Sequence, residues 1–110
     1  MRFDAATRTR ILNDMELGID PTGSTVEVKV GAAWYAATWL GVAVVTETDP
    51  KTGLPKKWTQ TARTTGYFAG PEAAVVAATV LLTATRHLTQ TRVTAGTDVI
   101  VADSSPVDVV

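Results

Sequence analysis

The sequence predicts a mainly β fold, an antiparallel β-sandwich or small barrel with one short N-terminal α-helix. The first observation is composition: 19 threonines, 15 valines and 16 alanines make up almost half of the 110 residues. Threonine and valine are β-branched and suit a pleated, partly buried surface. The second is the alternation of apolar and polar residues in "TVEVKV" (25–30) and "RHLTQTRV" (86–93). The third is a pair of turns that begin with Asp-Pro, at 20–23 and 49–53.

The N-terminal segment is predicted to be the one helix, over about residues 4–17. Asp4 is a favoured N-cap, Ile11 and Met15 fall on one helical stripe, and Gly18 is a suitable stop. The rest of the chain to residue 103 then forms a single β-rich domain.

The central segment "WYAATWLGVAVVTET" (34–48) is apolar on both faces of a strand. A strand with one solvated face should alternate, so this one is predicted to be covered on both sides, either by the helix or by another molecule. Tyr35 and Trp39 lie on the second face and are candidates for contact with a partner. An apolar face left uncovered after folding would itself need a partner.

Two segments leave alternatives open. Residues 71–85 begin like a helix, yet their valines and threonines favour a strand, which is the preferred prediction. Residues 104–110, "SSPVDVV", are predicted to be a C-terminal tail, either disordered or an arm that adds a strand to a neighbouring sheet. The N-terminal "MRF" is a candidate for the same role.

Three of the four lysines lie in the turn "DPKTGLPKK" (49–57). Lys51, Lys56 and Lys57 are predicted to decorate a solvated hairpin tip. Two alternatives remain: a basic contact to an acidic partner, or a nucleotide site. Phosphate cradles use consecutive backbone amides, which the two prolines obstruct here.

The sequence offers little for catalysis. It has no cysteine and a single histidine, His87, with no nucleophile-elbow motif around any serine. We therefore predict no catalytic residues, no metal site and no cofactor. The net charge of −1 predicts no attraction to nucleic acid or to a membrane surface.

Four short segments resemble a group of small virion proteins encoded in tailed-phage structural operons, notably of actinobacterial phages. The matching segments are "MRFDAATRTRILNDM" (1–15), "GSTVEVKVG" (23–31), "TTGYF" (64–68) and "VTAGTDVIV" (93–101). The segment "WYAATWLGVAVV" and the lysine-rich tip depart from the group's alanine-rich, proline-containing middle region.

The resemblance implies a capsid decoration or minor capsid protein in the virion, assembled in the host cytoplasm and binding the major capsid protein or other virion proteins, as a homo-oligomer within the particle. The candidate partner interface comprises Phe3, Tyr35, Trp39, Lys51, Lys56, Lys57, Val107, Val109 and Val110. The alternatives are a head-to-tail connector or tail-associated protein, and a carbohydrate-binding module that uses Trp34, Trp39 or Trp58.

Overall fold

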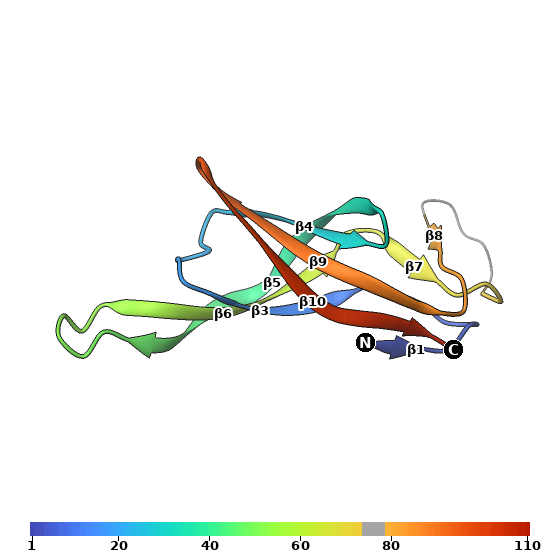
Figure 1. The fold of residues 1–110 in the computed structure, drawn as a ribbon, viewed down its shortest axis with the longest axis horizontal. Coiled ribbons are helices and arrows are strands. Elements are labelled where there is room, and N and C mark those ends of the chain that lie inside the picture. The colour runs from blue at the N-terminus through green and yellow to red at the C-terminus, as the bar shows by residue number, and fades with distance from the viewer. Residues whose placement is uncertain (74–78) are drawn as a thin grey trace.

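Strands make up 67% of the residues that the computed structural model describes, which are 1–73 and 79–110, and that part of the chain contains no helix (Figure 1). The mainly β prediction is confirmed. The strands are β1 (Arg2–Phe3), β2 (Arg8–Thr9), β3 (Leu12–Leu17), β4 (Thr25–Val30), β5 (Ala33–Thr48), β6 (Pro55–Thr64), β7 (Tyr67–Ala69), β8 (Thr79–Leu81), β9 (Arg86–Ala95) and β10 (Asp98–Val109).

Seven strands form one large sheet in the order β1-β10-β9-β4-β5-β6-β3, and β2, β7 and β8 form a small three-stranded sheet. Most neighbours are antiparallel, but β1 runs parallel to β10 and β7 runs parallel to β8. The large sheet curls into a half-barrel. Its concave side contains the core, and the small sheet covers one end of it.

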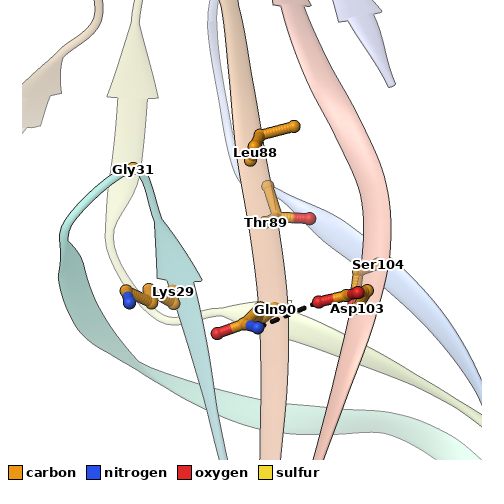
Figure 2. Close-up of a pocket in the computed structure, with 7 residues that line it drawn as sticks. All are labelled: Lys29, Gly31, Leu88, Thr89, Gln90, Asp103 and Ser104. Atoms are coloured by element: carbon orange, nitrogen blue, oxygen red, sulfur yellow. Dashed lines mark hydrogen bonds between the residues drawn. The ribbon is translucent and has the colours of Figure 1, made fainter.

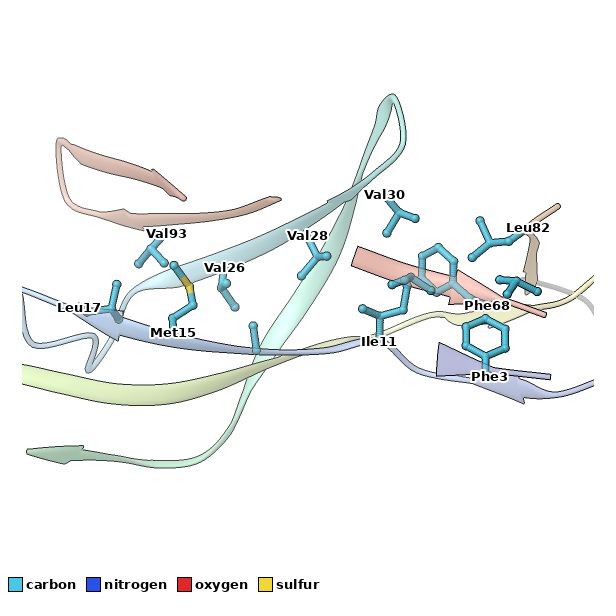
Figure 3. Close-up of a cluster of buried hydrophobic side chains, with 13 residues drawn as sticks. Phe3, Ile11, Met15, Leu17, Val26, Val28, Val30, Phe68, Leu82 and Val93 are labelled. Atoms are coloured by element: carbon cyan, nitrogen blue, oxygen red, sulfur yellow. The ribbon is translucent and has the colours of Figure 1, made fainter. Parts of the chain in front are cut away.

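The core consists of the inward-facing side chains of the large sheet together with Phe68 and Leu82 (Figure 3). Val28, Val93 and Val107 lie on the neighbouring strands β4, β9 and β10, and their side chains are fully buried. At the end near the small sheet, Phe3 and Phe68 pack beside Leu82. At 25 cal/mol per Å², burying side chains of this size supplies roughly 1.5–3 kcal/mol each.

A polar chain crosses the interior of the half-barrel. The Asn13 side-chain amide donates to Thr91 Oγ1 at 3.2 Å, and Thr91 Oγ1 lies 2.8 Å from Ser104 Oγ. Asn13 lies on edge strand β3, whereas the other two residues lie on β9 and β10. These hydrogen bonds therefore satisfy buried polar groups and link β3 to the far side of the curled sheet.

The predicted helix over about residues 4–17 is wrong, because this segment forms β2 and β3. Along β3, alternate residues are buried, and β3 pairs with β6. Ile11 and Met15 are four residues apart, a spacing that fits a helical stripe and one face of a strand equally well. Asp4 does not begin a helix, since its carboxylate accepts the Ala6 amide at 2.8 Å within a turn.

The C-terminal tail over 104–110 is also wrong, because β10 continues to Val109. Val107 and Val109 are buried in the core at 0% and 3% exposure. The N-terminal "MRF" pairs with this strand end, and the Asp108 amide donates to the Met1 carbonyl at 2.8 Å. The N-terminal and C-terminal segments, each a candidate for adding a strand to a neighbouring sheet, thus pair with each other instead.

The predicted strand over 71–85 is confirmed only for Thr79–Leu81, which is β8. Its part over residues 74–78 lies outside the described residues. Pro71–Ala73 form a turn, and residues 82–85 connect β8 to β9 without strand structure.

Candidate interaction surfaces

The distal half of the β5–β6 hairpin projects from the half-barrel, and beyond Val45 and Trp58, where β3 ends, it is a two-stranded ribbon (Figure 1). We call residues 41–58 the hairpin arm. Strand β5 pairs with β4 only over residues 33–37, so beyond this point its sole neighbour is β6. The register shifts between Leu40 and Val44, next to Gly41, whose φ is 77°. The arm contributes to a molecular length of 54 Å against widths of 23 and 22 Å.

The hairpin arm exposes several large apolar side chains. Val42 is 89% exposed, Val44 62% and Val45 42%, and Leu54 at the tip is 64% exposed. Leu40, directly before the arm, is 43% exposed. Two-stranded ribbons are only marginally stable alone in water, and clustered exposed apolar side chains mark binding surfaces. The arm is therefore the first candidate interaction surface.

The tip of the arm is the turn expected from its sequence. The Asp49 carboxylate accepts the Lys51 amide at 2.8 Å, and the Gly53 amide donates to the Asp49 carbonyl at 2.8 Å. Gly53 has a φ of 70°, which a residue with a Cβ rarely adopts. The exposed Lys51 lies on this turn.

The other two lysines are engaged by carboxylates. Glu47 lies 3.4 Å from Lys56 Nζ and 3.3 Å from Lys57 Nζ, and Lys57 also lies 3.4 Å from Glu16. The hydrogen bond from Lys57, followed by the Lys56 contact, lowers the pKa of Glu47. These pairs neutralise the base of the tip, which supports the solvated turn over a phosphate site.

The structure separates the predicted interface residues into three groups. Phe3, Val107 and Val109 are buried in the core and are not available to a partner. Tyr35 and Trp39 are half-buried against the core, and the Tyr35 ring meets Phe68 edge-on at 4.9 Å. Lys51, Lys56 and Val110 are exposed and Lys57 is partly exposed, with Val110 far along the chain from the lysines.

On β5, the most exposed apolar side chains are therefore not the two that the sequence interpretation selected. Tyr35 and Trp39 occupy the inward face of β5, as shown by the hydrogen bond from Trp39 Nε1 to Ser24 Oγ at 3.0 Å. The exposed residues are the smaller ones farther along. No strand pairs with the outer edge of β5 beyond Ala37, where these residues lie.

The three tryptophans do not share a surface. Trp34 pairs with Lys29 and lies beneath the Arg92 guanidinium, 4.2 Å from its ring centroid, on the outer face of the sheet. Trp39, five residues later on the same strand, lies on the opposite face. Trp58 pairs with Val45 and Leu17 at the base of the arm. This arrangement gives no common platform for stacking a sugar chain.

A polar hollow of about 360 Å³ lies on the outer side of β4, β9 and β10 (Figure 2). It is lined by Lys29, Gly31, Leu88, Thr89, Gln90, Asp103 and Ser104. The Gln90 side-chain amide donates to the Asp103 carboxylate at 2.9 Å, so these two groups already satisfy each other. The hollow contains a single carboxylate and a single ammonium group, a poor set for acid–base chemistry.

A second cluster of charges lies on the small sheet, and we call Arg8, Arg10 and Tyr67 the arginine–tyrosine cluster. The guanidinium carbons of Arg8 and Arg10 lie 3.8 and 4.7 Å from the centroid of the Tyr67 ring. Sequence analysis missed this cluster, because it placed residues 4–17 on a helix. Two arginines at alternate positions next to a β-type segment were the signal that could have found it.

A smaller exposed apolar group lies on the β9–β10 hairpin: Leu88 is 70% exposed, Val99 58% and Val101 49%. His87 is engaged locally, with Nε2 2.9 Å from the Thr83 carbonyl oxygen. Within residues 1–73 and 79–110, no three carboxylate or imidazole groups converge as metal ligands would. The same residues include no apolar helix of membrane-spanning length.

Comparisons with known proteins do not identify a relative. No protein-family model matches the chain, and neither a curated protein nor a solved structure shows significant similarity to it. The functional argument therefore depends on the surfaces described above.

Proposed function

We propose that this protein is a structural component of a phage particle, a capsid decoration or minor capsid protein that binds the major capsid shell through the hairpin arm. The observation that carries the proposal is the exposure of Val42, Val44 and Val45, side chains over which the described part of the molecule places no layer. A neighbouring subunit would supply that layer. The resemblance of four sequence segments to small virion proteins supports the choice of partner.

Binding would stabilise the complex through the hairpin arm itself. Each buried valine contributes roughly 1.5 kcal/mol or more, and the ribbon would lose its fraying motions in the complex. A standard interface covers roughly 800 Å² on each partner, so both faces of the arm would have to take part. Many copies around a symmetric shell, as a homo-oligomer, would convert modest single contacts into lasting attachment.

Co-sedimentation with empty, expanded capsid shells tests the proposal. The variant Val42→Ser/Val44→Ser should lose binding by at least about tenfold, because it removes two apolar side chains that the complex would bury. The matched control is Val99→Ser/Val101→Ser, which alters an equivalent pair of exposed valines on β10 and should bind as the wild type does. A wild-type chain that stays in the supernatant, or equal loss in both variants, contradicts the assignment to the arm.

A head-to-tail connector or tail-associated protein of the same particle is the second candidate. The elongated shape, with the arm at one end, favours it, because such an arm can reach across to the next subunit of a ring. Binding to isolated portal rings with no binding to shells would select this candidate. The third alternative, a carbohydrate-binding module, has less support, because Trp34 and Trp39 lie on opposite faces of β5.

A further inference from the structure

The small sheet presents the arginine–tyrosine cluster at the end of the molecule opposite the tip of the hairpin arm (Figure 1). Arg8 pairs with Ala69 and Thr9 pairs with Phe68, so Arg8 and Arg10 lie on the same outer face of β2. Arg8 Nε donates to Thr79 Oγ1 at 3.1 Å, which fixes the first guanidinium. The second lies above the same Tyr67 ring. Both guanidinium groups therefore contact one aromatic ring.

Neither guanidinium forms an ion pair with a carboxylate in the described part of the chain. The residues outside it, 74–78, are only alanine and valine, so they carry no side-chain charge. In addition, Arg10 Nε is buried and has no hydrogen-bond partner among the described residues. Two like charges beside each other are a costly arrangement, which a bound anion would relieve.

The surroundings indicate which anion fits. Several other cations are already paired: Lys56 and Lys57 with Glu47, Arg86 with Asp108, and Arg92 with Glu27. A nucleic-acid strand needs a track of free cations along its phosphates, whereas the two guanidinium groups of the cluster sit together on a single Tyr67 ring. Leu81, on the neighbouring strand β8, is 50% exposed. Arginine and tyrosine are both enriched at protein interfaces.

We propose that Arg8, Arg10 and Tyr67 form a binding site for a carboxylate side chain of an acidic protein segment. The planar guanidinium groups would donate paired hydrogen bonds to the carboxylate oxygens, the geometry for which arginine is suited. This site is independent of the proposed capsid function, since it uses none of the arm residues. A chain with both surfaces would bind one partner at each end.

An NMR titration tests the site on the full chain, with an acetylated hexaglutamate peptide as the probe. The peptide should shift the Nε–Hε signals of Arg8 and Arg10. In the variant Arg8→Gln/Arg10→Gln its affinity should fall by about tenfold, because two charge-assisted contacts are lost. The control Lys29→Gln/Lys51→Gln removes the same charge elsewhere and should change the affinity by less than about twofold. The single variant Arg8→Gln, at an exposed position, replaces the double variant if the latter does not fold.

Three results would overturn the proposal. One is the absence of any shift of the two arginine signals with the peptide. Another is an equal loss of affinity in the lysine control, which would show that only net charge matters. The third is tighter binding of hexathymidylate or inorganic phosphate than of the peptide, which would make the site one for phosphate groups. The arm variants Val42→Ser/Val44→Ser leave the cluster intact, so failure of one proposal does not affect the test of the other.

Discussion

The two halves of strand β5 both carry apolar residues and have different surroundings. The proximal half, residues 33–40, pairs with β4 over residues 33–37 and with β6 from Ala37 onward, and its inward residues Tyr35, Ala37 and Trp39 pack against the core. The distal half, residues 41–48, pairs only with β6 and leaves Val42 and Val44 largely exposed. Both halves are apolar on both faces, yet only the proximal half has an apolar layer within the molecule.

The difference between the two halves shows how much can be inferred from an apolar run along a strand. Such a run shows that both faces are to be covered, but it does not identify the cover. For the proximal half, the inner cover is the core and part of the outer cover is the Arg92 side chain above Trp34. For the distal half, the described part of the molecule provides no cover over Val42 and Val44. Among the described residues, the exposed large apolar side chains are most numerous on the hairpin arm and the β9–β10 hairpin, and single ones such as Leu12 and Leu81 lie elsewhere.

Substitution of one valine in the core and one in the arm should give the largest difference in the free energy of unfolding. Val28 is fully buried on β4, whereas Val42 is 89% exposed on the arm. Val28→Ala should lower the free energy of unfolding by roughly 2–3 kcal/mol, through lost transfer energy and the cavity left behind. Val42→Ala should change it by less than about 0.5 kcal/mol. Urea denaturation of both variants provides the measurement, and similar losses in the two would show that the arm is covered within the molecule.

Alanine substitutions at two glycines should also differ in their effect on the free energy of unfolding, by a smaller amount than the two valine substitutions. A Cβ at Gly70 would overlap the backbone of Ala5, whereas a Cβ at Gly41 would meet nothing within 4 Å. Gly70→Ala should lower the free energy of unfolding by about 1–3 kcal/mol, because the backbone at Gly70 and the backbone at Ala5 must move apart. Gly41→Ala should cost about 1 kcal/mol, solely from its positive φ of 77°.

Thermal denaturation of the two variants compares them. In addition, hydrogen exchange should speed up in the arm alone for Gly41→Ala, and around β2 and β7 for Gly70→Ala. Faster exchange throughout the molecule for Gly41→Ala would contradict the separation of the arm from the core.

The sequence predicted those strands whose patterning is local and unambiguous. In β4 the alternation of valines with charged residues identifies the inward face without reference to any partner strand. The tip turn was equally predictable, because Asp49 and Gly53 determine it through their own hydrogen bonds and backbone angles. These features depend on residues that are close in the chain.

The features that sequence reasoning missed depend on pairing between distant segments. Residues 12–17 become a strand because β6, more than forty residues away, provides the ladder, and Asn13 finds its partner in Thr91. The C-terminal segment is ordered because β1 and β9 flank it. The arginine–tyrosine cluster needs β2 and β7 side by side. None of these pairings leaves a local signal strong enough to override a plausible helix or tail.

The smallest expected effect concerns the charges at the base of the arm. The lysines lower the pKa of Glu47 below its ordinary value of 4.5. A carboxylate with a lowered pKa stabilises the fold above its unfolded pKa, and this stabilisation disappears as the pH falls through the folded pKa. The variant Glu47→Gln should therefore speed hydrogen exchange in the arm at about pH 7 and match the wild type at about pH 3.

Glu72→Gln provides the control, since Glu72 is an exposed carboxylate remote in sequence from the arm and has no ion pair among the described residues. It should leave exchange in the arm unchanged at both pH values. The core strands β4 and β9 should not respond to either variant, because the charge cluster contacts only the ribbon and Glu16 at the end of β3. If the difference between Glu47→Gln and the wild type persists at about pH 3, the side chain stabilises the arm by packing. If the difference extends to β4 and β9, the arm and the half-barrel unfold as one unit, and the contrast between the two halves of β5 is then a difference in exposure alone.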